Sequence, residues 1–183
     1  MRFRFTSPGI ALTLTVALTH SSPVHADSAL PEYEVKAAIV YKVSKFVDWP
    51  PGSFESDDAP IVLCIAGRDP FGKFIDNLSG QIVHGRSLVI HRVADSELSF
   101  RRCHILFIGA DSSGIEILAN AGSQAVLTIG DSKGFAAHGG MLELRIENNR
   151  VKFQVNLEVA RDSDLDISAS LLQLATIVES PGG

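Results

Sequence analysis

Residues 61–73 read IVLCIAGRDPFGK, an apolar run followed by a glycine-containing turn and a lysine. This order of strand, turn and helix start is typical of α/β proteins, and the glycine spacing matches most of a phosphate-binding loop. Such a loop needs Ser or Thr at the next position to hold Mg²⁺, whereas this chain has Phe74. Asp69 and Pro70 also suit the cap and first turn of an ordinary helix. Nucleotide chemistry at Gly67–Lys73 is therefore the least favoured of three functional hypotheses.

On both sides of this segment, strand-like apolar runs alternate with amphipathic stretches. This alternation predicts an α/β fold with a mainly parallel, Rossmann-like sheet flanked by helices. The predicted strands are 61–66, 87–93, 103–108 and 125–129, and the predicted helices are 32–47, 69–78 and 113–121. In the first helix the apolar spacing predicts one buried stripe. That stripe consists of Val35, Ile39, Val43 and Phe46.

The pattern changes after residue 140. Segments 141–146 and 150–156 alternate apolar and polar residues around the turn 147–149, which predicts a half-exposed β-hairpin added to the sheet. Residues 167–178 are predicted to close the chain as a helix. Its apolar face would be Leu171, Leu172, Leu174, Ala175 and Val178.

The first 26 residues have the features of a secretory signal peptide. Arg2 and Arg4 precede an apolar run at 10–18, and Val24-His25-Ala26 offers the small residues that a signal peptidase recognises. The apolar run is shorter than the roughly 20 residues that span a bilayer. We expect cleavage after Ala26, export to the periplasm without membrane insertion, and one domain over 27–183.

The net charge of the exported chain limits the classes of partner that it can bind. The full chain has 16 Lys and Arg against 21 Asp and Glu, a net charge of −5. Residues 1–26 hold two arginines and no acid, so 14 basic and 21 acidic residues remain, a net charge of −7. This acidic balance disfavours nucleic acid and anionic lipid as partners.

The two cysteines, Cys64 and Cys103, both lie in apolar strand-like runs. An even pair in an oxidising compartment favours a disulfide, and the alternative is two buried free thiols. A bond closing about 40 residues would stabilise the fold by roughly 4 kcal/mol in the chain-entropy model.

Several short segments resemble the YfiR family, in order and over nearly all of residues 27–183. They are 34–39, 46–50, 67–72, 127–131, Gly134-Phe135, Gly139-Gly140, 153–156, Ala160 and 168–175. The resemblance implies a periplasmic repressor that binds an inner-membrane diguanylate cyclase through its periplasmic segment and so restrains cyclic-di-GMP signalling and biofilm formation. It implies no cofactor and no catalysis. It also makes a redox-sensitive disulfide plausible at the two cysteines, although the second cysteine pair of some members is missing here.

Enzymatic signatures are weak. The histidines His84, His91, His104 and His138 have no metal-ligand spacing, and no nucleophile elbow is present. We therefore expect no metal and no catalytic residues.

A ligand crevice is the second hypothesis. Parallel sheets bind ligands beyond the carboxyl ends of their strands, where Asp69 and Asp131 fall. Such a periplasmic small-ligand sensor would use Asp69, Gly72, Asp131, Gly134, Gly139 and Gly140. The competing interpretation is that the aspartates cap a helix and a turn while the glycines shape turns.

A partner surface is predicted around the end of the first helix. Binding energy concentrates in a few large side chains, and this region holds Tyr33, Tyr41, Trp49 and Phe54. We expect an exposed apolar patch there that contacts the membrane partner or forms a homodimer. The alternative is that Trp49 packs against the sheet.

Overall fold

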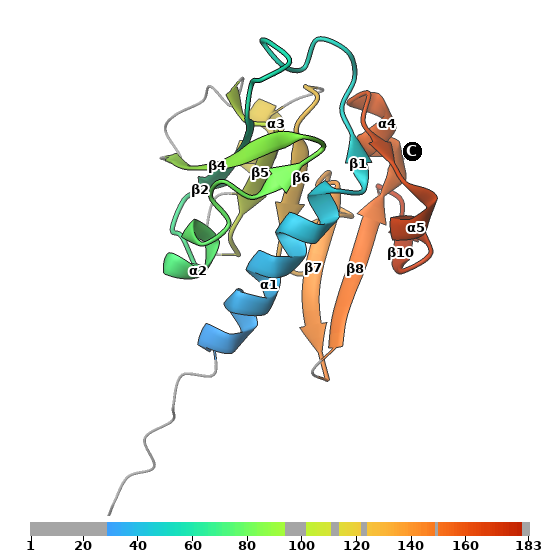
Figure 1. The fold of residues 1–183 in the computed structure, drawn as a ribbon. Coiled ribbons are helices and arrows are strands. Elements are labelled where there is room, and N and C mark those ends of the chain that lie inside the picture. Colours follow the sequence, from blue (N-terminus) through green and yellow to red (C-terminus); the bar gives the residue numbers. More distant parts are fainter. Residues whose placement is uncertain (1–28, 94–101, 111–113, 122–123, 149, 181–183) are drawn as a thin grey trace, which may run out of the picture.

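The computed structural model describes residues 29–93, 102–110, 114–121, 124–148 and 150–180. Within them an eight-stranded sheet has the order β10-β8-β7-β6-β5-β2-β4-β3 (Figure 1). Its strands are β2 (Ile61–Ala66), β3 (Ile82–Val83), β4 (Arg86–Val93), β5 (Ile105–Ile108), β6 (Leu127–Gly130), β7 (Leu142–Glu147), β8 (Arg150–Asn156) and β10 (Ala175–Val178). The helices are α1 (Ala29–Ser44), α2 (Lys73–Asp76), α3 (Gly114–Ala121), α4 (Leu157–Asp162) and α5 (Ala169–Leu172). A separate antiparallel pair joins β1 (Val47–Asp48) to β9 (Asp166–Ile167).

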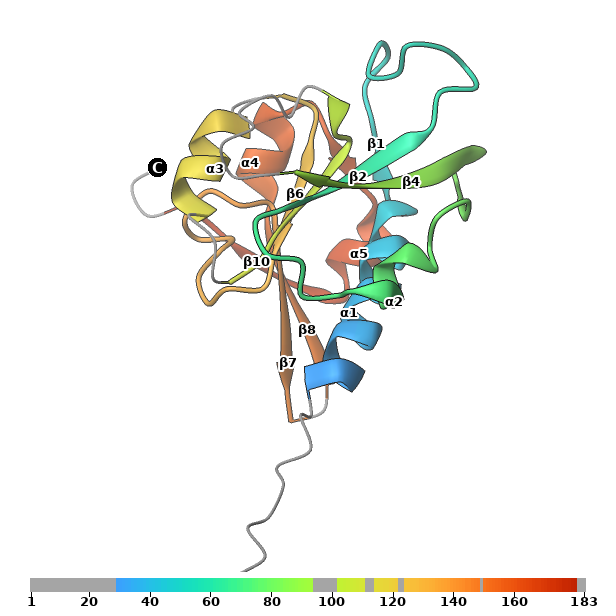
Figure 2. The same ribbon diagram turned by 90° about the vertical axis from the view of Figure 1, so that its left-hand side faces the viewer.

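The predicted fold class is confirmed. Strands β4, β2, β5, β6 and β7 are parallel, and β7 and β8 form the predicted antiparallel hairpin. Figure 2 shows α1 and α2 on one side of the sheet and α3 on the other. Both β2 and β5 are buried along their whole length, as expected for central parallel strands covered on two faces.

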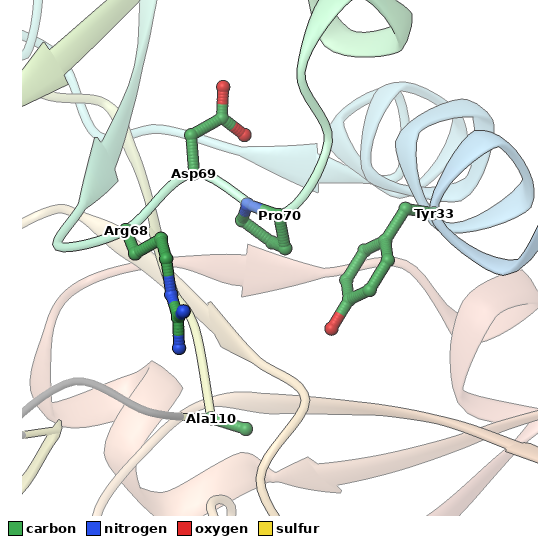
Figure 3. A pocket seen from close by; sticks show the side chains of 5 residues that line it. All are labelled: Tyr33, Arg68, Asp69, Pro70 and Ala110. Carbon is green, nitrogen blue, oxygen red and sulfur yellow. The ribbon is translucent and has the colours of Figure 1, made fainter. Parts of the chain in front are cut away.

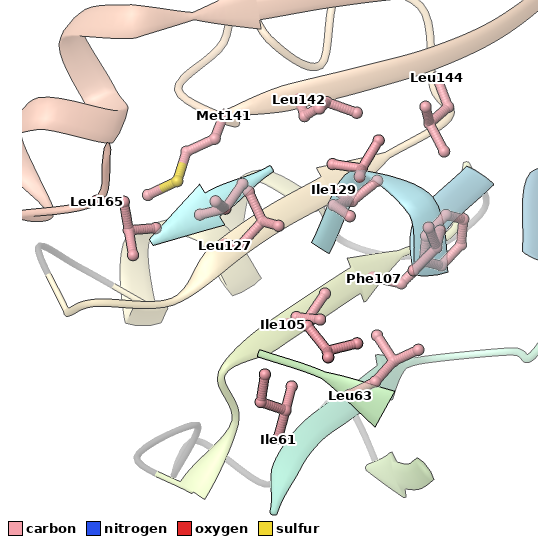
Figure 4. Close-up of a cluster of buried hydrophobic side chains, with 14 of the residues drawn as sticks. Ile61, Leu63, Ile105, Phe107, Leu127, Ile129, Met141, Leu142, Leu144 and Leu165 are labelled. Carbon is pink, nitrogen blue, oxygen red and sulfur yellow. The ribbon is translucent and has the colours of Figure 1, made fainter. Parts of the chain in front are cut away.

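Side chains of the central strands alternate between two cores. Ile61, Leu63 and Phe107 belong to the larger core beneath α1 (Figure 4). Their neighbours Val62 and Leu106 belong to the smaller core beneath α3. Each face of the sheet therefore holds its own helix by apolar burial.

Helix α1 buries a different face from the one predicted. Its buried positions are Lys36, Ala37, Val40, Val43 and Ser44. Of the predicted stripe only Val43 is fully buried, whereas Val35 is 43% and Phe46 41% exposed. The prediction was wrong because apolar residues occur on both sides of this helix, so spacing alone does not decide which side faces the sheet.

Two predicted helices were also wrong in extent. The segment 69–78 has α-helix only in α2, because Gly72 adopts a left-handed conformation (φ 54°) that separates the turn from the helix. The closing helix is replaced by α5 and the strand β10, which pairs in parallel with β8. The β-branched residues Thr176, Ile177 and Val178 favour a strand here.

Candidate functional site

The helices that follow the neighbouring strands β2 and β5 lie on opposite faces of the sheet. The β2 connection passes through α2 on the α1 face to β4, whereas the β5 connection passes through α3 on the opposite face to β6. Such a switch point is where open parallel sheets bind ligands. A pocket of about 380 Å³ lies there (Figure 3). It is lined by Tyr33, Arg68, Asp69, Pro70 and Ala110.

The predicted residue Asp69 lines this pocket, but its carboxylate is engaged elsewhere. Its Oδ1 accepts hydrogen bonds from the backbone N–H groups of Phe71 (2.7 Å) and Gly72 (3.2 Å). Its Oδ2 accepts from Arg92 Nε at 2.8 Å, and Arg92 also pairs with Asp76. These two acids hold the pKa of Arg92 above its ordinary value. Asp69 therefore shapes its own loop, and it occupies amides that a phosphate would need.

A buried charge network lies behind the Tyr33 wall of the pocket. The Asp131 side chain is 1% exposed, and its Oδ2 accepts from Tyr33 Oη (3.0 Å) and Lys36 Nζ (2.8 Å). Lys36 also pairs with Glu32 one helical turn away. Burial first, then the charge of Asp131, raises the pKa of Tyr33, which keeps its hydroxyl protonated as the donor.

The second oxygen of Asp131 has no hydrogen-bond partner among the described residues. A buried carboxylate oxygen without a partner costs free energy, and such atoms cluster at functional sites. The network fastens the amino-terminal half of α1 to the carboxyl end of β6. Asp131 thus lies near the crevice, as expected, but covered by Tyr33 and Lys36.

The predicted crevice glycines occupy other places. Gly72 precedes α2, while Gly134 and Gly139 take left-handed conformations in the turn after Asp131. A methyl group at Gly140 would overlap the Phe135 ring. Gly134 and Gly139 thus shape the turn and Gly140 leaves room for Phe135, and the described pocket lining includes none of the three.

At the opposite, amino-terminal ends of the strands, His104 fixes the loop that precedes β2. Its Nδ1 accepts from the Val62 N–H (3.0 Å), so its Nε2 carries the proton and donates to Ser53 O (3.1 Å). The ring stacks on Phe54 with 4.4 Å between centroids, and Arg86 covers the other face of Phe54. Burial, with the Arg86 charge adding to it, lowers the pKa of His104, although its bond to Ser53 opposes this. Sequence reasoning missed this role because histidine spacing carries no signal for it.

The predicted disulfide is present in the same region. Cys64 and Cys103 are bonded with their Cα atoms 5.7 Å apart, inside the range that a disulfide spans. The bond lies in the core beneath α3, next to the start of β5. It joins β2 to the chain two residues before β5 begins.

The predicted partner-surface residues are half-buried. The indole N–H of Trp49 donates to His104 O, and Trp49 packs edge-on against Phe54. Tyr41 Oη donates to Ile82 O at 3.1 Å. Beside them Phe46 and Ile82 are the exposed large apolar side chains, Ile82 at 53%.

Metal-binding groups and membrane-spanning helices are both absent from the described part of the chain. It contains no group of three His, Cys, Asp or Glu side chains placed to hold a metal ion. No helix in these residues has the length and apolarity to cross a membrane. Residues 1–26, where a signal peptide is predicted, lie outside the described residues.

The fold and crevice define an α/β protein with a mainly parallel eight-stranded sheet and a pocket at its switch point. The chain belongs to the YfiR/HmsC-like family, whose model matches residues 33–176. No curated protein matches the chain. Family membership supports a regulatory role in the periplasm in general terms.

Proposed function

We propose that this protein is an exported regulator that binds the periplasmic segment of an inner-membrane signalling protein, with a diguanylate cyclase as the first candidate. One observation carries the proposal: α1 has a second, outward apolar face. Val35 and Ala38 are exposed along it, with Ile39 half-buried beside them, and Phe46, two residues beyond the end of the helix, is exposed as well. A helix of a folded domain needs only one apolar face for its own core, so the second face is available for a partner.

The charge on this face indicates the chemistry of the partner. Lys42 and Lys45 are exposed beside Phe46, on a chain whose net charge is negative. Lys45 Nζ lies 4.3 Å from the centre of the Tyr41 ring, which fixes a positive charge at this place. We propose that the partner presents an amphipathic helix whose apolar residues meet the α1 face and whose acids meet the two lysines.

Tyr41, Trp49 and Phe54 would form the rim of this partner surface, whereas Tyr33 lines the pocket instead. Regulation follows by population shift: the protein must bind the inactive form of the cyclase more tightly than the active form. Domain 27–183 would act as one unit in this role.

The test compares cyclic-di-GMP in native cells with and without the gene. Deletion should raise cyclic-di-GMP, and the wild-type gene should restore it. A chain with Val35→Glu and Phe46→Glu should fold but fail to restore it, because two charges enter the apolar face. Lys152→Glu, an exposed charge change on β8, is the matched control and should restore it fully. Unchanged cyclic-di-GMP after deletion contradicts the cyclase as target.

A small-ligand sensor is the second candidate, favoured by the pocket at the switch point. The ligand would lie against Tyr33, Pro70 and Ala110, beside Arg68. Native mass spectrometry of protein isolated from the periplasm should then detect a bound small molecule, and Ala110→Leu should remove it. Nucleotide turnover at Gly67–Lys73 is not expected, because Asp69 occupies the Phe71 and Gly72 amides. An ATPase assay on the purified protein tests this.

A further inference from the structure

The loop 50–60 between β1 and β2 contains no helix or strand and extends beyond both strands (Figure 2). Side chains of other elements hold it in place. Arg86 of β4 donates from one nitrogen, Nη1, to the carbonyl oxygens of Ser56, Asp57 and Ala59. An arginine side chain stays charged at every pH that a folded protein meets, so this contact does not respond to acid.

The second side chain that holds the loop is His104, and its contact does respond to acid. Nδ1 accepts from the Val62 N–H and Nε2 donates to Ser53 O, while the ring stacks on Phe54. This pattern requires the neutral imidazole. A protonated ring carries hydrogen on both nitrogens, so it cannot accept from the Val62 N–H.

The surroundings of His104 also disfavour a second positive charge. The guanidinium carbon of Arg86 lies 3.9 Å from the centre of the Phe54 ring, on which His104 stacks from the other side. Burial first, and then the Arg86 charge, lower the pKa of His104, against the bond to Ser53 O. A form with the loop detached and the ring in water takes the proton more readily, so acid shifts the population toward that form.

Other ionisable groups near His104 lie in more water. Three of them line a pocket of about 340 Å³ together with His104: Glu55 of the loop, His91 of β4 and Arg102 before β5. All three are exposed, and so is His84 on the far side of Trp49. Salt and water screen exposed charges more than buried ones. Among the histidines that the structure describes, His104 alone has both ring nitrogens hydrogen-bonded to the backbone.

We propose that the loop 50–60 is an acid-released part of the protein: neutral His104 holds it against the strand ends, and a proton on His104 frees it. Phe54 then loses its stacking partner, and Trp49 loses the Phe54 ring against which it packs. These two side chains are rim residues of the proposed partner surface. The protein would therefore hold its partner at neutral pH and release it in acid. That last step rests on the proposed function, whereas the movement of the loop does not.

The first test uses the purified exported chain without a partner. Trp49 is the single tryptophan, so its fluorescence reports on this region alone. Acidification from about pH 7.5 to about 4.5 should shift its emission to longer wavelength as water reaches the indole. The shift should have the same midpoint as the NMR titration of the His104 ring and of the Val62 N–H. The NMR signals of β7 and β8 should stay in place, which shows that the sheet remains folded.

Two matched variants assign the response. His104→Gln should abolish the fluorescence shift, whereas His91→Gln, an exposed histidine at the same pocket, should leave it as in the wild type. A wild-type Trp49 signal that stays flat over this pH range, or that changes only when β7 and β8 unfold, overturns the proposal. This wild-type result decides the matter even where a variant fails to fold.

The second test measures release of the partner in native cells, grown in medium at about pH 7 and at about pH 5, since protons cross the outer membrane. The wild-type gene should lower cyclic-di-GMP below the deletion strain at neutral pH and lower it less in acid. His104→Gln should show no such difference. Equal lowering by the wild type at both pH values overturns the release by acid. No lowering at neutral pH contradicts the proposed function instead, and the fluorescence test then still decides the movement of the loop.

Discussion

The two ends of the parallel strands are built in opposite ways. At the amino-terminal ends a disulfide, a fully bonded His104 and a stack of aromatic rings lock the chain. At the carboxyl-terminal ends the structure buries a charge network, leaves an oxygen of Asp131 without a partner among the described residues, and has a pocket. The amino-terminal ends of the strands therefore supply stability, whereas the carboxyl-terminal ends keep polar groups that a ligand or a partner can use.

The largest effect expected is at the amino-terminal end. Replacing Cys64 and Cys103 together by Ala should lower the free energy of unfolding by about 4 kcal/mol, from the loop of 39 residues that the bond closes. Urea titration of the oxidised wild type and the double variant measures this. A loss below about 1 kcal/mol would show that the disulfide adds little to the stability of the amino-terminal ends of the strands.

A slightly smaller effect is expected at the carboxyl-terminal end. Asp131→Ala leaves Lys36 buried with the half-exposed Glu32 as its one ionic partner in the described part of the chain, which should cost about 3 kcal/mol. The double variant Lys36→Met with Asp131→Leu removes both charges and should recover most of that loss. If the double variant is as unstable as the single one, packing rather than charge burial decides stability at this end.

A third effect depends on pH. The pKa of His104 is lowered in the folded protein, so below about pH 6.5 the unfolded chain binds this proton first and stability falls as the pH falls. The slope from one such proton is at most about 1.4 kcal/mol per pH unit. His104→Gln should flatten this part of the curve, measured as the difference from wild type between pH 7 and 5. Identical pH curves for the two proteins would contradict the role of His104 in holding the loop.

The sequence predicts the parallel core and the hairpin because their patterns are unambiguous. A continuous apolar run such as 61–66 has no exposed face to choose, and 150–156 alternates strictly. The buried face of α1 was not predictable in this way, because apolar residues occur on both sides: Val35 and Phe46 are exposed, whereas Ala37 and Val40 are buried. That choice depends on Asp131, which is 95 residues from Lys36 and draws this side of the helix inward.

The candidate site was predictable in place but not in role. Asp69 follows β2 and Asp131 follows β6, two parallel strands whose carboxyl ends lie at the same edge of the sheet on either side of β5, so their approach to one crevice follows from topology. Their partners do not follow from it: Arg92, Tyr33 and Lys36 come from a strand end and a helix whose orientation sequence does not give. The role of His104 could not be predicted either, because its bonds to Val62 and Ser53 exist only once the loop has folded.

The smallest effect expected comes from filling the pocket. Ala110 is exposed at the pocket wall, so Ala110→Leu should change the free energy of unfolding by less than about 0.5 kcal/mol. The cysteine double variant, by contrast, changes a group that stabilises the fold, and it is expected to lose far more unfolding free energy. Urea titration of Ala110→Leu beside the wild type measures the difference. A loss above about 2 kcal/mol would place Ala110 among tightly packed residues and remove the contrast between the two ends of the strands.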